Sequence, residues 1–249
     1  MSRRKAFRNL VFRILDKILA PYLFYGRAMN SLRPVREFYF RAFKALSVNQ
    51  ISGDYAEFGV YRAGKWTLAY HYSRLVGYPC KLWGFDSFEG LPVNDTEFEE
   101  HPNWTQGRMR SSEAEFHRIC RERGIPRSEY EIVPGLFAET LEYQSGAKEP
   151  TNIALALIDC DLYTSAKSVL AFLGPRLKHG MIIAFDDYWI WSENNVSGER
   201  KAFLEFQVEN PEWHFEPFFP LGWHGASFVV EKKSLLSLNG EGSPRPKGD

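Results

Sequence analysis

The stretch IALALIDCDLYTS, residues 153–165, decides the fold of this chain. Residues 153–158 are all apolar, which indicates a strand that is buried on both faces of a sheet. Asp159 and Asp161 follow directly. A second apolar run, residues 181–185, also ends in acids, here Asp186 and Asp187. If the two strands are neighbours in a parallel sheet, their acidic ends meet in one cleft.

The chain on either side of this stretch alternates between strand-like and helical segments. Strands are expected at 55–60, 81–85, 130–133, 153–158 and 181–185, and helices near 35–46, 65–76, 113–123, 165–177 and 199–209. Such alternation predicts an α/β fold, in which a parallel sheet carries helices on both faces. Residues 213–218 and 226–231 predict an antiparallel hairpin at one edge of the sheet.

The ends of the other predicted strands carry residues that suit a nucleotide-like ligand. Gly59 and Gly64 follow the first strand and allow backbone to approach a ligand closely. Asp86 follows the second strand, where an acid can accept hydrogen bonds from ribose hydroxyls. Gly135 follows the third strand, in a position that suits an adenine ring. Taken singly, each of these residues is also explained by a structural turn or cap.

The acids after the strands ending at 158 and 185 point to a metal. Carboxylates that lie close together repel and raise one another's pKa values, and a divalent cation relieves this repulsion. Mg²⁺ prefers oxygen ligands and keeps positions for water or substrate oxygens. We expect Asp159 to bind the metal. We expect Asp161 to reach the substrate as a general base, which takes the proton of a metal-activated hydroxyl.

Several segments together resemble the macrocin O-methyltransferase family. They are GDYAEFGVYRAG (53–64), LWGFDSFEGLP (82–92), VPGLFAETL (133–141), LIDCDLYTS (157–165), FDDY (185–188) and GERKAFLEF (198–206). The resemblance implies a Rossmann-like, seven-stranded class I methyltransferase sheet with a C-terminal antiparallel hairpin. It also implies a metal-dependent transfer of the methyl group of S-adenosylmethionine to a sugar hydroxyl of a natural product or polysaccharide.

By the same resemblance, Asp159, Asp186 and Asp187 are the expected ligands of Mg²⁺ or another divalent cation, and Asp161 is the base. The resemblance implies cofactor contacts from Glu57, Gly59, Asp86 and Ser87, and the predicted cofactor site further includes Val60, Gly64 and Gly135. This chain has Cys160 where the family often has glycine. It also reads YTSA at 163–166 where the family often has Tyr-Glu-Ser-Thr, which leaves the acceptor open.

Three other functions share part of this pattern. A metal-dependent methyltransferase of a catechol-like hydroxyl would use the same acids, since the metal chelates two adjacent oxygens in either case. An inactive domain that binds S-adenosylmethionine and serves as a partner surface would keep the same fold. A glycosyltransferase would use Asp159 and Asp161 with Mn²⁺, but it predicts neither the turn at 57–64 nor the acids at 186–187. Aromatic rings that could stack on either acceptor are those of Trp104, Trp189, Trp191 and Trp223, with His224 beside them.

The charge composition argues against a nucleic-acid partner. The chain has 249 residues, with 31 Lys plus Arg and 31 Asp plus Glu, so it lacks the basic surplus of a nucleic-acid binder. Its three cysteines, Cys80, Cys120 and Cys160, form no close pair, which fits a reducing compartment and predicts a cytoplasmic protein.

The N-terminal region predicts an amphipathic helix at 5–19 that ends at Pro21, with a basic face of Arg4, Arg8, Arg13 and Lys17. Its apolar face could pack on the domain or on a second subunit, which would make a homodimer. It could also act as a lid, or residues 3–19 could lie on an anionic membrane surface. The expected organisation is an N-terminal helical extension or lid (1–50), a methyltransferase domain (51–237) and a disordered tail (238–249).

Overall fold

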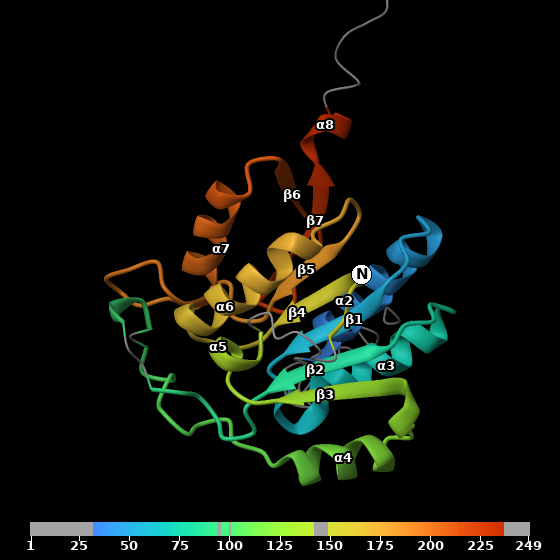
Figure 1. The fold of residues 1–249 in the computed structure, drawn as a ribbon, viewed down its shortest axis with the longest axis horizontal. Coiled ribbons are helices and arrows are strands. Elements are labelled where there is room, and N and C mark those ends of the chain that lie inside the picture. Colours follow the sequence, from blue (N-terminus) through green and yellow to red (C-terminus); the bar gives the residue numbers. More distant parts are fainter. Residues whose placement is uncertain (1–31, 94–95, 100, 142–148, 237–249) are drawn as a thin grey trace, which may run out of the picture.

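The computed structural model describes residues 32–93, 96–99, 101–141 and 149–236. They form a seven-stranded sheet with the order β3-β2-β1-β4-β5-β7-β6 (Figure 1). The strands are β1 (Asp54–Phe58), β2 (Leu82–Asp86), β3 (Tyr130–Pro134), β4 (Ile153–Ile158), β5 (Ile182–Phe185), β6 (Trp213–Pro217) and β7 (Ala226–Lys232). Strands β1 to β5 are parallel, whereas β7 is antiparallel to both β5 and β6. The predicted α/β sheet with its C-terminal hairpin is confirmed.

Helices cover both faces of the sheet (Figure 1). The α-helices are α2 (Leu32–Val48), α3 (Gly64–Leu75), α4 (Glu113–Glu122), α5 (Phe137–Thr140), α6 (Tyr163–Leu173), α7 (Gly198–Glu209) and α8 (Lys233–Leu236), and the 3-10 turns are η1 (Tyr61–Ala63), η2 (Glu97–Glu99), η3 (Arg127–Glu129) and η4 (Gly174–Arg176). Because side chains alternate along a strand, the sheet has a hydrophobic core on each of its two faces. Tyr55 and Leu157 pack with α2 and α3, whereas Phe58 and Ile158 pack with α6 and α7.

Two elements end earlier than the sequence predicts. Strand β1 stops at Phe58 because Gly59 has a φ of 95°, which leaves the extended conformation. Helix α6 stops at Leu173, and residues 174–176 form the separate turn η4. Pro175 causes this second difference, since proline has no N–H for a further helical hydrogen bond.

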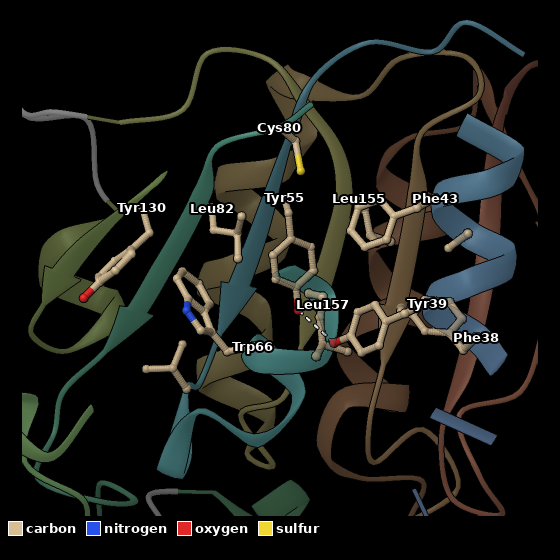
Figure 2. Packing of buried hydrophobic residues seen from close by; sticks show 14 of the residues in the cluster. Phe38, Tyr39, Phe43, Tyr55, Trp66, Cys80, Leu82, Tyr130, Leu155 and Leu157 are labelled. Carbon is tan, nitrogen blue, oxygen red and sulfur yellow. Dashed lines mark hydrogen bonds between the residues drawn. The ribbon is translucent and has the colours of Figure 1, made fainter. Parts of the chain in front are cut away.

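Helix α2 shares the core of the sheet (Figure 2). Its residues Phe38, Tyr39 and Phe43 are fully buried, and the hydroxyl groups of Tyr39 and Tyr55 lie 2.9 Å apart. Pro34 lies in the first turn of α2, where a missing N–H has no intrahelical partner to lose. This helix thus confirms the second helix expected from the sequence.

The predicted helix at 5–19, with its proposed subunit or membrane contact, and the tail at 238–249 lie outside the described residues. The domain limits at residues 50 and 237 remain predictions. Among the described helices, none combines the length and apolar character that crossing a bilayer requires.

The order of the strands fixes where a ligand can bind. Strand β1 lies between β2 and β4, so the chain changes direction across the sheet at the β1/β4 boundary. In sheets of this kind, ligands bind beyond the carboxyl ends of the strands at this switch point. The residues that follow β1, β2, β4 and β5 are therefore brought to one edge.

Candidate active site

A cavity of about 300 Å³ opens at the carboxyl ends of β1 to β4. Predicted site residues that line it are Gly59, Asp86, Ser87, Gly135, Asp159 and Asp161. Glu57, Val60 and Gly64 are not among its lining residues, although they belong to the same strand and turn. The structure therefore brings the predicted cofactor residues of β2 and β3 together with the first acidic pair.

Gly59 lets the end of β1 lie directly against the end of β4. Its φ of 95° is in the region that favours glycine, and a Cβ atom there would come within 1.9 Å of the backbone oxygen of Asp159. A backbone hydrogen bond from Asp159 to the oxygen of Phe58 at 2.9 Å joins the two strand ends, and one from Gly59 to the oxygen of Phe85 at 2.8 Å joins β1 to β2. A side chain at this position would push the ends of β1 and β4 apart.

Asp86 combines a turn cap with a place in the cavity wall. Its Oδ2 atom accepts a hydrogen bond from the backbone nitrogen of Val60 at 2.8 Å, and its Oδ1 atom accepts one from that of Phe88 at 2.7 Å. Burial raises the pKa of Asp86, while these two backbone donors act in the opposite direction. Each carboxylate oxygen keeps lone pairs that a ribose hydroxyl can use.

Glu57 faces the core between the sheet and α2. It is 2% exposed, and the hydroxyl of Tyr55 donates a hydrogen bond to its Oε2 atom at 2.5 Å. Burial raises the pKa of Glu57 to about 8. Tyr39 extends this chain of hydroxyl groups to α2 (Figure 2). Glu57 thus lies in the core behind the β1 end of the site and does not line the cavity.

The two acidic pairs meet as the sequence predicts. Asp161 has a φ of 61°, so the chain turns sharply after β4, and a side-chain hydrogen bond joins Asp161 to Asp187. Burial, followed by the carboxylate of Asp161, raises the pKa of Asp187 to about 8. Burial raises the pKa of Asp159 to about 6. The cluster therefore has more negative charge than its buried surroundings readily hold.

Lys65, in the first turn of α3, reaches into this cluster. Its Nζ atom lies 2.8 Å from Asp159 Oδ2 and 2.6 Å from Asp186 Oδ2. Burial by itself would lower the pKa of Lys65, but these two carboxylates raise it well above its usual value. Lys65 is therefore a full cation that bridges the ends of β4 and β5.

Glu199, in the first turn of α7, ties the two acidic loops together. Its side chain is fully buried, and its Oε1 atom accepts hydrogen bonds from the backbone nitrogens of Cys160 at 3.0 Å and Asp161 at 3.3 Å. The Oε2 atom accepts one from the backbone nitrogen of Asp187 at 3.0 Å. Glu199 holds the backbone that carries the proposed base and one proposed metal ligand.

The donor set at this edge suits a divalent cation. Asp186 Oδ1 is buried and has no hydrogen-bond partner within the described part of the chain. Ligand atoms of Asp186, Asp187 and His224 lie within 4.8 Å of one another. His224 Nδ1, however, lies 2.6 Å from the backbone oxygen of Asp186 and must donate its proton there. Nδ1 is thus not available as a ligand, whereas Nε2 of the same ring and the carboxylates of Asp186 and Asp187 are. Asp159 is not part of this cluster, and its Oδ2 atom is paired with Lys65.

The aromatic residues expected near the site differ in exposure. Trp189, Trp191 and Trp223 are exposed, and the backbone of Trp189 bonds to that of His224 at 2.7 Å. Trp104 is only 3% exposed and packs against Leu162, so its ring is covered. None of these three exposed indole rings is among the lining residues of the cavity.

Sequence reasoning gave no role to Lys65 or Glu199. A glutamate at the start of a helix, such as Glu199, is common because it suits the helix dipole, and so it carries no signal of a site. A lysine in the first turn of a helix is unfavourable because it lies at the positive end of the helix dipole. This local conflict at Lys65 was the one sequence feature that pointed to an acidic partner. Only the tertiary structure shows which acids resolve it.

Known proteins match the chain in sequence and in fold. Residues 28–211 match the family described as Macrocin-O-methyltransferase (TylF). The 8-demethyl-8-(2,3-dimethoxy-alpha-L-rhamnosyl)-tetracenomycin-C 4'-O-methyltransferase of Streptomyces olivaceus is 31% identical over 151 residues, which are 56% of this chain and 54% of that protein. The demethyldecarbamoylnovobiocin O-methyltransferase of Streptomyces niveus is 29% identical over 150 residues, again 56% and 54%. The chain spans about half the length of these curated relatives.

The solved structure of the O-methyltransferase NovP superposes with a TM-score of 0.66 at 21% sequence identity, covering 79% of each chain. At this identity, the likeness supports the fold. The family match is broader, because it includes the β1 turn, Asp86 and both acidic pairs. By this match over most of its length, the chain belongs to the macrocin O-methyltransferase family.

Proposed function

We propose that this chain is an S-adenosylmethionine-dependent, Mg²⁺-dependent O-methyltransferase of a hydroxyl group on a sugar or a glycosylated small molecule. One observation carries the proposal. The cavity at the switch point has Asp86 in one wall and the acids that follow β4 in another. A methyl donor and an acceptor hydroxyl can therefore be held side by side.

The cofactor would lie in this cavity. Asp86 would accept hydrogen bonds from the ribose hydroxyls, with Ser87 beside it, while Gly59 and Gly135 let the backbone approach. Glu57, Val60 and Gly64 would act on the cofactor indirectly, by shaping the turn after β1. Val60 does so through the hydrogen bond that its backbone nitrogen donates to Asp86. When bound, S-adenosylmethionine supplies the methyl group.

Asp159, Asp186 and Asp187 would hold the metal, which supplies positive charge that lowers the pKa of the acceptor hydroxyl. Asp161 lines the same cavity and would take the proton of that hydroxyl. The turn at Asp161, with a φ of 61°, takes the backbone out of the direction of β4. Glu199 holds that turn through the backbone nitrogen of Asp161.

A sugar acceptor is favoured by the names of the curated relatives, one of which is a 4'-O-methyltransferase of a rhamnosyl compound. The exposed rings of Trp189, Trp191 and Trp223 suit the apolar face of a sugar. A catechol-like hydroxyl is the second candidate, because the same rings can stack on a flat acceptor. Enzymatic assay of both acceptor classes would separate the two.

The decisive experiment begins with binding. EDTA-treated protein is titrated calorimetrically with S-adenosylmethionine, and then with Mg²⁺ in the presence of the cofactor. We expect cofactor binding in the micromolar range and a saturable Mg²⁺ site that Asp159→Ala removes. A folded sample that binds no cofactor would overturn the proposal, and nucleotide sugars with Mn²⁺ would be tested next.

A further inference from the structure

The ammonium group of Lys65 occupies the space between the two acidic strand ends. It contacts the Oδ2 atoms of Asp159 and Asp186 at 2.8 and 2.6 Å, and its side chain is 23% exposed. These are two of the three carboxylates proposed as metal ligands. A positive charge from the chain itself thus lies where the proposed function needs a divalent cation.

The location of Lys65 is explained by the acids rather than by its helix. A cation in the first turn of α3 faces the positive end of the helix dipole, which is unfavourable. Close, buried carboxylates that lack a counter-charge repel each other strongly. By bridging Asp159 and Asp186, Lys65 relieves that repulsion when no metal is present.

A metal and this ammonium group would compete for the same carboxylates. Mg²⁺ binds carboxylate oxygens at roughly 2.0–2.1 Å, so a metal shared by Asp159 and Asp186 would lie close to Lys65 Nζ. Two cations this close repel each other in a poorly solvated site. The four-carbon stem of lysine is flexible, and its partial exposure leaves a route out.

We propose that Lys65 is the resident cation of this site, and that it must leave Asp159 and Asp186 before a divalent metal binds. Lys65 therefore sets the metal affinity, and with it the metal concentration at which the enzyme works. This inference rests on the proposed metal-dependent function.

The test uses Mn²⁺ as a paramagnetic probe on the full chain after EDTA treatment. Free Mn²⁺ is followed by electron paramagnetic resonance for wild type, Lys65→Met and Lys81→Met. Lys81 is the matched control, since it is also ion-paired, with Glu131 at 2.9 Å, but lies before β2 at the other end of the strands. We expect Lys65→Met to bind Mn²⁺ at least about tenfold more tightly than wild type, and Lys81→Met to match wild type.

A second measurement needs no variant, which matters because loss of Lys65 leaves two buried acids without their partner. Wild-type protein is reductively methylated with formaldehyde and a borane, and mass spectrometry follows the labelling of Lys65. Saturating Mg²⁺ should speed up labelling of Lys65 relative to EDTA, while the rate at Lys81 stays constant. An Mg²⁺-saturated protein whose Lys65 labels at the EDTA rate would overturn the proposal.

The outcomes separate this inference from the proposed function. Measurable and equal Mn²⁺ affinities in wild type and folded Lys65→Met would contradict the competition alone. Absence of Mn²⁺ binding in both proteins, while S-adenosylmethionine still binds, would contradict the metal-dependent function and the competition with it. Tighter binding in Lys65→Met together with faster labelling of Lys65 supports both.

Discussion

Glu199 accepts a hydrogen bond from the backbone nitrogen of Asp187 at 3.0 Å, which joins the start of α7 to the loop after β5. The same carboxylate binds the loop after β4 through Cys160. A helix that follows the site in sequence thereby sets the spacing of the two acidic pairs that precede it.

Replacing Glu199 should therefore damage the site without emptying the cofactor cavity. For Glu199→Ala we expect kcat to fall by at least about tenfold with cofactor affinity retained, because three backbone donors lose their acceptor. Glu199→Gln should recover part of the rate, since its one amide oxygen still accepts. Steady-state kinetics with calorimetry would check this, with exposed Glu209→Ala in the same helix as the control. Wild-type kinetics in Glu199→Ala would contradict the positioning role.

Asp161→Asn should abolish most turnover while leaving cofactor and metal binding intact. An amide keeps the shape of the side chain but cannot take a proton at neutral pH, and loss of a general base typically costs about 10²- to 10⁴-fold in rate. Single-turnover assays and calorimetry on the same preparation would separate chemistry from binding. Turnover near the wild-type rate would remove Asp161 as the base.

Gly59→Ala should be severely destabilising, by more than about 3 kcal/mol, with loss of cofactor binding. The added Cβ would come within 1.9 Å of the backbone oxygen of Asp159, and neither strand end can move alone. Gly124→Ala is the matched control, because Gly124 also has a positive φ, of 71°, but nothing lies within 4 Å of its Cβ position. That control should cost only about 1 kcal/mol. Equal losses in the two variants, measured by urea unfolding, would mean that backbone conformation alone matters.

Glu57→Gln should stabilise the protein increasingly as pH rises. Glu57 titrates at about 8 in the folded chain against an ordinary value of 4.5, so folding favours its protonated form. The contribution of Glu57 to the free energy of unfolding is therefore fully present below pH 4.5. It falls as pH rises from there through 8, by at most about 1.4 kcal/mol per pH unit. Glutamine stays neutral and can still accept the hydrogen bond of Tyr55. Urea unfolding of both proteins at pH 5 and pH 8 would check this, and a pH-independent difference would contradict a buried neutral Glu57.

The local signals in the sequence were sufficient to predict the fold and the edge of the sheet at which the candidate site residues gather. The apolar run at 153–158 followed by Asp159 predicted a buried parallel strand with an acid at its carboxyl end, because an uninterrupted apolar run has to be covered on both faces. The same reasoning placed Asp86 and Asp187 at the same edge. Parallel strands share one direction, so residues that follow them gather without any knowledge of side-chain packing.

Side-chain partners across elements needed the tertiary structure. The hydrogen bond that Glu57 accepts from Tyr55, and the contact of Tyr55 with Tyr39 of α2, were not predicted from the sequence. The cofactor contact of Glu57 stays a prediction. Lys65 and Glu199 acquire their roles from carboxylates and backbone groups far away in sequence. The sequence by itself determined which residues end each strand, since hydrophobic periodicity is a local property. Only the folded chain decided which charges face one another, because electrostatic partners depend on distances that close when the sheet and its helices pack.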